Sequence, residues 1–272
     1  MKKLSIVVFS ACFLLIAFSS FAADIELAKK STINTVLSRG ELRVGFDSGT
    51  PPFEMEDKNG NYIGFDIDLA RELSRAMGVK FVPVDIDFNE IIPALLTGKI
   101  DVIIGALSIT QERNLKIGFS EPYFIVGQSV LLNKKLEGKI TLWSQLNNLE
   151  YTVLSQKGTT GEEAAKRYLG NANLKTVEGD AGAFEVVNDR ADAWVFDMPF
   201  NVVFYAEHGK GKVVHLDQPF TYEPLGIGIS QGDPDFMNFI NNFLRQFKGD
   251  GRYERLYEKW VTRTDWFERI RR

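Results

Sequence analysis

Residues 41–84 read ELRVGFDSGTPPFEMEDKNGNYIGFDIDLARELSRAMGVKFVPV and predict a strand, a helix and a second strand in that order. Apolar residues dominate the first segment, 42–46, and the last, 80–84, as expected for buried strands. Between them Phe65, Leu69, Leu73 and Met77 recur every four residues, which predicts one apolar helix face, and the following Gly78 is a typical helix stop. A helix between two strands indicates an α/β fold with largely parallel sheets.

The rest of the chain repeats this alternation. Further strands are expected at 101–105 and 193–196. Further helices are expected at 90–96, 161–169, 181–188, 234–248 and 251–260. The sequence contains no internal repeat, low-complexity tract or long linker.

The N-terminus has the layout of a signal peptide. Lys2 and Lys3 precede an apolar run over 4–18, and Ser20-Phe21-Ala22 offers a small-x-small cleavage site. The run is shorter than the roughly 20 residues that cross a bilayer. We therefore predict a signal peptide over residues 1–22 and export to the periplasm, with an uncleaved anchor as the alternative.

The only cysteine, Cys12, lies inside that apolar run. A lipoprotein would be acylated there, but the apolar residues continue beyond Cys12, so a cleaved signal is favoured. The mature chain then has no thiol for disulfides, metals or catalysis. The histidines, His208 and His215, have no ligand-type neighbours at metal-binding spacing and are expected in surface segments or loops. Neither a metal nor a cofactor is predicted.

The charge balance excludes some partners. The formal charge of −4 becomes −6 when the two signal-peptide lysines are removed. A mildly acidic exported protein is a poor partner for nucleic acid or an anionic membrane surface. We expect a monomer.

Several short motifs follow one another in a fixed order. They are Leu42–Asp47, Pro52–Glu54, Gly64–Leu69, Ile91–Leu95, Ile109–Arg113, Phe119–Tyr123, Lys157–Thr160, Ala191–Ala193 with Asp197, and Asp250–Tyr253. In this order they resemble the family 3 extracellular solute-binding proteins of polar amino acid ABC transporters, over about residues 40 to 262.

The resemblance implies a type II periplasmic-binding-protein fold, in which two lobes are joined by two crossing hinge strands and the ligand lies in the interlobe cleft. Lobe 1 would comprise 24–124 and 225–272, and lobe 2 would comprise 129–220. The hinge would lie at 126–129 and 222–225. Its implied partners are a free amino acid and a permease in the inner membrane.

A free amino acid presents a carboxylate and an ammonium, and both must be paired when the lobes close. Arg113 offers a planar fork of donors for the carboxylate and follows the plausible helix cap Thr110. Thr160 opens another helix, with Glu163 completing a capping box, and its N–H would reach the same carboxylate. The resemblance adds Ser108 to this set.

Asp197 follows the predicted strand 193–196, at the sheet edge where α/β ligand clefts lie, and is the natural partner of the ammonium. In the family pattern the carbonyls of Gly105 and Ala106 also accept from that ammonium. Positions matching the variable part of the family pocket are Asp47, Thr50, Phe88 and Gln156.

An acidic Asp47 near the distal end favours a guanidinium, an ammonium or a carboxamide over a carboxylate, so an acidic ligand is disfavoured. Among the remaining ligands, lysine or arginine is favoured over glutamine. Glu54 and Glu90 either add negative potential there or are solvated.

Two other functions share this architecture. Periplasmic dehydratases resemble the family but would carry a further carboxylate three residues after the cleft aspartate, where this chain has Phe200. No other residue provides an evident catalytic acid, so we predict a binding protein rather than an enzyme. A sensory subunit is the second alternative, and it would signal through a separate partner.

Overall fold

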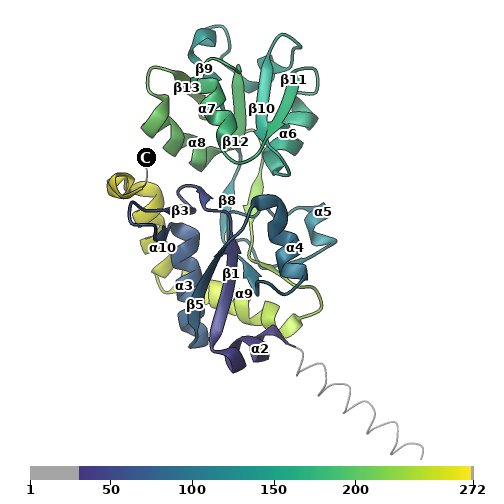
Figure 1. Cartoon of the computed structure of the whole chain (residues 1–272), viewed down its shortest axis with the longest axis vertical. Helices are drawn as coiled ribbons and strands as arrows, with labels where there is room; N and C mark the ends of the chain where they lie inside the picture. Colours follow the sequence, from purple (N-terminus) through teal and green to yellow (C-terminus); the bar gives the residue numbers. More distant parts are fainter. Residues whose placement is uncertain (1–30, 271–272) are drawn as a thin grey trace, which may run out of the picture.

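The computed structural model describes residues 31–270, which form two α/β lobes stacked along the long axis of the molecule (Figure 1). The predicted signal peptide over 1–22 and Cys12 lie outside these residues. Between residues 31 and 270 no helix combines the length and the apolar character needed to cross a membrane.

The sheet of the first lobe has the strand order β5-β1-β6-β15-β7. These strands are β1 (Glu41–Phe46), β5 (Lys80–Asp85), β6 (Val102–Ile103), β7 (Gly118–Phe119) and β15 (Gly228–Ile229). β1 pairs in parallel with β5 and β6, as predicted, whereas β15 is antiparallel to both of its neighbours. This lobe therefore draws one strand from late in the chain.

Among residues 31–270, six α-helices belong to the first lobe. They are α2 (Thr32–Arg39), α3 (Phe65–Met77), α4 (Ile91–Leu96), α5 (Gln111–Asn114), α9 (Pro234–Gly249) and α10 (Arg252–Tyr257). α3 is the helix predicted from its four-residue spacing: Phe65, Leu69 and Leu73 are fully buried, and Gly78 ends the helix with a φ of 69°. Only a residue that tolerates a left-handed backbone fits that stop.

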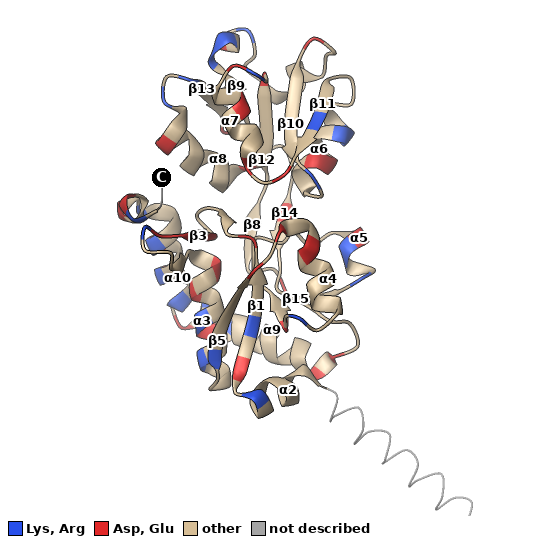
Figure 2. Ribbon diagram, viewed as in Figure 1, with Lys and Arg blue, Asp and Glu red and all other residues tan. Residues whose placement is uncertain are grey.

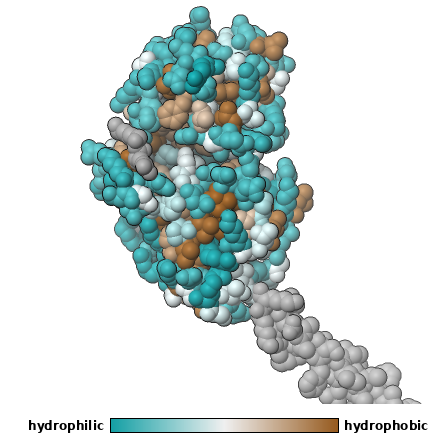
Figure 3. All heavy atoms as spheres, viewed as in Figure 1, coloured by the Kyte–Doolittle hydropathy of each residue, from teal (hydrophilic) through white to brown (hydrophobic). Residues whose placement is uncertain are grey.

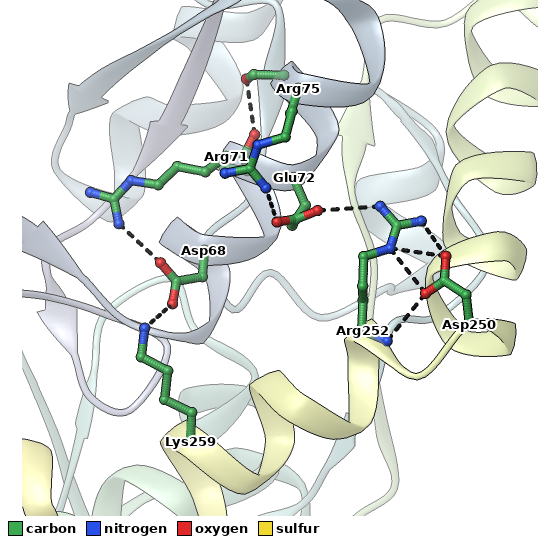
Figure 4. A network of polar contacts seen from close by, with 9 residues as sticks. Asp68, Arg71, Glu72, Arg75, Asp250, Arg252 and Lys259 are labelled. Carbon is green, nitrogen blue, oxygen red and sulfur yellow. Dashed lines mark hydrogen bonds and ion pairs between the residues drawn. The ribbon is translucent and has the colours of Figure 1, made fainter.

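Side chains of the segment that follows α9 contact side chains of α3 (Figure 4). Arg252 Nη1 lies 3.2 Å from Glu72 Oε2, and Lys259 Nζ lies 2.6 Å from Asp68 Oδ2. Such partly exposed ion pairs contribute about 0–1 kcal/mol each. Most of the attachment comes from Trp260 instead, which is 1% exposed and donates its indole N–H to Asp68 at 2.8 Å.

The second lobe has the strand order β11-β10-β12-β9-β13. Its strands are β9 (Gln128–Asn133), β10 (Thr152–Gln156), β11 (Asn173–Val177), β12 (Ala193–Asp197) and β13 (Val213–Leu216), and its helices are α6 (Thr160–Tyr168), α7 (Ala181–Val187) and α8 (Met198–Phe204). β10, β11 and β12 are parallel, but β9 is antiparallel to β12 and β13. His215 lies in the edge strand β13 and is partly exposed.

Two strands connect the lobes. β8 (Phe124–Val126) pairs antiparallel with β14 (Glu223–Leu225), and both lie between the lobes in Figure 1. A small sheet formed by β2 (Gly49–Thr50), β3 (Glu54–Glu56) and β4 (Tyr62–Ile63) lies on the first lobe and faces the gap. Two connecting segments permit the lobes to move as rigid bodies about them.

Candidate functional site

A pocket lies between the lobes, and the space-filling view shows the notch that separates them (Figure 3). It is lined by Thr50, Phe88, Gly105, Ala106, Ser108, Arg113, Gln156, Thr159, Thr160, Phe196 and Asp197. All the predicted site residues except Asp47 are among them. The cavity volume is about 20 Å³, which is room for about one water molecule. The lobes are therefore nearly closed here and must separate to admit an amino acid.

Arg113 lies in α5 and is held between the lobes. Its backbone N–H donates to the Thr110 hydroxyl at 3.1 Å, so the predicted cap forms. Nη1 donates to the carbonyl of Ser108 at 2.9 Å, and Nη2 reaches across to the carbonyl of Gly158 at 3.2 Å. The guanidinium also stacks over the Phe88 ring, 5.3 Å from its centroid. Burial lowers the pKa of Arg113, but arginine stays charged at neutral pH.

Ser108 and Thr160 face each other across the cleft, with their hydroxyl oxygens 3.3 Å apart. Thr160 is the first residue of α6, so its N–H has no acceptor within the helix. The predicted cap was wrong by one residue. The Thr159 hydroxyl caps α6 by accepting from the N–H of Glu162 at 3.3 Å, and the Glu162 carboxylate accepts from the N–H of Gly158 at 2.7 Å.

Asp197 is the last residue of β12 and is 6% exposed. Its carboxylate accepts a 2.6 Å hydrogen bond from the side-chain amide of Gln128. Burial, reinforced by the nearby Glu223 carboxylate, raises the pKa of Asp197 to about 8. A cation placed against this carboxyl would favour its ionised form.

Gly105 and Ala106 form a wall of the pocket from main chain. A Cβ on Gly105 would lie 2.9 Å from the Cβ of Phe46, so a larger residue does not fit there. Ala106 has a φ of 47°, an unusual value for a residue with a side chain. Its N–H donates to the carboxylate of Asp66 at 2.7 Å, which holds this conformation.

Asp47 does not line the pocket. Its carboxylate accepts a 3.0 Å hydrogen bond from the backbone N–H of Phe88 instead. A main-chain donor therefore holds the Asp47 side chain, and its place at the distal end of a ligand stays a prediction. Asp47 still fixes the backbone that carries the Phe88 ring, and burial raises its pKa.

Two polar residues of the hinge adjoin the site and were not predicted. Gln128 begins β9 directly after the first hinge strand, and Glu223 begins β14. The Glu223 carboxylate accepts from the hydroxyl of Ser108 at 3.1 Å and from that of Thr221 at 2.8 Å. The available signal was the presence of a glutamine and a glutamate in the segments expected to form the hinge.

Acidic residues lie on both sides of the gap between the lobes (Figure 2). Glu54 is 1% exposed, so the solvated alternative is wrong for this residue, whereas Glu90 is exposed. Within residues 31–270, no three His, Cys, Asp or Glu side chains are grouped to hold a metal ion. The arrangement suits a small molecule that carries both a carboxylate and positive charge.

Known proteins resemble this chain over most of its length. A binding protein from Wolinella succinogenes, described as a component of an ABC transporter and solved with lysine, is 51% identical, with a TM-score of 0.82 and coverage of 85% of this chain and 100% of that one. An ancestral amino acid-binding protein, described as a precursor of cyclohexadienyl dehydratase, is 46% identical, with a TM-score of 0.79 and coverage of 85% and 99%.

A glutamine-binding ABC transporter protein of Bacillus subtilis is 30% identical and covers 96% of this chain and 98% of its own. The sequence profile of the bacterial extracellular solute-binding proteins, family 3, matches residues 42–263. The chain therefore belongs to family 3 of the bacterial extracellular solute-binding proteins and has their two-lobed type II fold.

Proposed function

We propose that this protein is the extracytoplasmic component of an ABC importer and binds a free cationic amino acid, lysine or arginine. One observation carries the proposal: the guanidinium of Arg113 and the buried carboxyl of Asp197 line the same interlobe pocket. A free amino acid supplies the opposite charge to each of these groups. Closing the lobes around it gives both of these buried groups a partner of opposite charge.

The ligand carboxylate would bind Arg113, Ser108 and the N–H of Thr160. Because Thr160 comes from the second lobe, this contact forms only when the lobes close, and binding thereby favours closure. The ammonium would bind Asp197 and the carbonyls of Gly105 and Ala106.

The ligand side chain would lie along Phe88, with Thr50 and Gln156 beside it. The negative charge that Asp47 contributes near the pocket favours a cationic side chain. The 51% identity to a protein solved with lysine supports the same choice. Glutamine is the competing ligand, because the Bacillus subtilis relative is a glutamine-binding protein.

We infer binding without catalysis. Phe200, three residues after Asp197, is 2% exposed and offers no proton. The dehydratase alternative would need a carboxylate at that position. We further propose a monomer that is exported to the periplasm and delivers its ligand to an inner-membrane permease.

A thermal-shift screen of the twenty amino acids on ligand-stripped protein tests the proposal. A ligand at 100 times its Kd adds about 2.7 kcal/mol to the free energy of unfolding. We expect the largest shift with lysine or arginine. A shift with glutamine alone would contradict the cationic preference, and no shift with any amino acid would contradict the binding function.

A further inference from the structure

Two buried carboxyl groups, those of Glu54 and Asp66, lie behind the Gly105–Ala106 wall of the pocket. Glu54 is 1% exposed and Asp66 is fully buried. Asp66 Oδ2 accepts from the N–H of Ala106 at 2.7 Å and from the hydroxyl of Tyr123 at 2.6 Å. One hydrogen bond therefore connects this carboxyl to the wall.

The side chain of Glu54 is on the pocket side of its sheet. Glu54 in β3 is directly opposite Thr50 in β2 in the antiparallel register. Opposite residues of an antiparallel pair project to the same face, and Thr50 lines the pocket. The charges of Asp47 and Asp197 also contribute to raising the pKa of Glu54. The Glu54 carboxyl is therefore close enough to the pocket to act on a charge bound there.

One oxygen of each carboxyl lacks a hydrogen-bond donor when both groups are taken as acceptors. These atoms are Glu54 Oε2 and Asp66 Oδ1, and both are buried. The two carboxyls are within hydrogen-bonding reach of each other. Ionised carboxylates only accept, and two of them in contact repel each other. One proton placed between the two groups removes both problems. Burial first, and then Asp66, raises the pKa of Glu54 well above its usual range, and burial raises that of Asp66 to about 6.

We propose that Glu54 and Asp66 share one proton, and that the single negative charge of this pair helps the pocket select cationic over neutral amino acids. The inference rests on the proposed binding function. Asp66 contacts the wall through the N–H of Ala106, and neither member of the pair lines the pocket, so both are positioning residues. The titratable groups that face the pair from neighbouring elements are Asp47, Tyr123, Asp197 and Tyr253, all acids or phenols.

The test compares E54Q with the double variant E54Q/D66N. In E54Q the amide donates to Asp66 and the charge stays on Asp66, so the preference for lysine is retained. The double variant keeps the shape and loses the charge. Calorimetry with lysine, arginine and glutamine at pH 7 gives the Kd ratios. We expect the ratio of glutamine to lysine to fall about tenfold in the double variant, which is about 1.4 kcal/mol.

If the pair has a purely structural role, the double variant should bind all three ligands more weakly by the same factor. An unchanged ratio of the glutamine Kd to the lysine Kd, in a double variant that still binds these ligands, would overturn the selection role alone. Wild-type protein that binds none of them would overturn the proposed function and the selection role together. Infrared difference spectra of wild type against E54Q at pH 7 test the shared proton without ligand or double variant. We expect the difference spectrum to show a carbonyl band of a protonated carboxylic acid that wild type has and E54Q lacks, because the band of protonated Asp197 is common to both proteins and cancels. A difference spectrum without that band would overturn the shared proton.

Discussion

The side-chain amide of Gln128 donates a 2.6 Å hydrogen bond to Asp197, so a hinge residue directly contacts the acid proposed to bind the ligand ammonium. Gln128 is fully buried, and its backbone N–H donates to the hydroxyl of Thr221 at 2.8 Å. Thr221 in turn donates to Glu223, which accepts from Ser108. Hydrogen bonds thus connect the proposed ammonium site to the proposed carboxylate site through the hinge.

Replacing Gln128 by Leu is expected to weaken ligand binding about tenfold at pH 7, the loss of one charge-assisted hydrogen bond of about 1.5 kcal/mol. This hydrogen bond lowers the pKa of Asp197 against the effect of burial. Without it more of Asp197 is protonated at neutral pH, so affinity should recover as the pH rises towards 9. Calorimetry between pH 6 and 9 measures this, and a variant with the wild-type pH profile would contradict the coupling.

Asp197→Asn is expected to abolish detectable ligand binding and yet stabilise the ligand-free protein at alkaline pH. Folding raises the pKa of Asp197 from 3.8 to about 8, so the fold favours the protonated form. The corresponding stability is fully present below pH 3.8 and is lost as the pH rises through about 8. An asparagine carries no such penalty, and the gain at pH 8.5 should be roughly 2–5 kcal/mol.

Denaturant unfolding of both proteins at pH 5 and pH 8.5 measures the change. The free energy of unfolding of the wild type should fall relative to the variant between these pH values. If the two proteins differ in free energy of unfolding by the same amount at both pH values, Asp197 is ionised in the folded protein without a ligand.

Arg113→Ala should weaken ligand binding by at least about 2 kcal/mol, because a buried ligand carboxylate loses its partner. Arg113→Lys is the matched control, since it keeps the charge but loses the planar fork that also spans Ser108 and Gly158. We expect an intermediate affinity for the lysine variant. Titration calorimetry decides, and an unchanged Kd for the alanine variant would refute the assigned role.

Features that depend on neighbouring residues in the sequence, such as the buried face of a helix, could be predicted because local patterns determine them. The burial of Phe65, Leu69 and Leu73 follows from helical spacing alone. Thr159 and Thr160 could not be distinguished as caps, since both have a glutamate three residues later and only the backbone path selects one. The hydrogen bond from the main chain of Phe88 to the Asp47 carboxylate could not be predicted, because the two residues lie 41 positions apart in sequence.

Sequence patterns could not predict the contacts that Gln128 and Glu54 make. Gln128 meets Asp197 across 69 residues of chain. Glu54 approaches Asp66 only because a short hairpin folds back towards α3. Contacts of this kind depend on how the hinge and the small sheet are positioned. The sequence placed Gln128 in the hinge and Glu54 in a family motif, but it did not predict the partner of either residue.

Gly158→Ala is expected to weaken ligand binding by hindering closure of the lobes. Gly158 has a φ of 76°, and a Cβ there would lie 2.2 Å from Oδ1 of Asn89 in the other lobe. Asn89 also crosses the gap to Glu178, with Nδ2 3.1 Å from Oε2, so the methyl group would displace a side chain that joins the closed lobes. Gly138→Ala is a matched control in the second lobe, because Gly138 has the same φ of 76° and nothing within 4 Å of an added Cβ.

The two variants separate backbone strain from interference with closure. Both should lose about 1 kcal/mol of folding stability from the left-handed backbone, measured by thermal unfolding without ligand. Only Gly158→Ala should raise the Kd, and mainly through faster dissociation, since the closed state is the one destabilised. Stopped-flow measurement of ligand association and dissociation distinguishes the two rates. Equal Kd values for the two variants would show that the contact between Gly158 and Asn89 has no part in holding the lobes closed on the ligand.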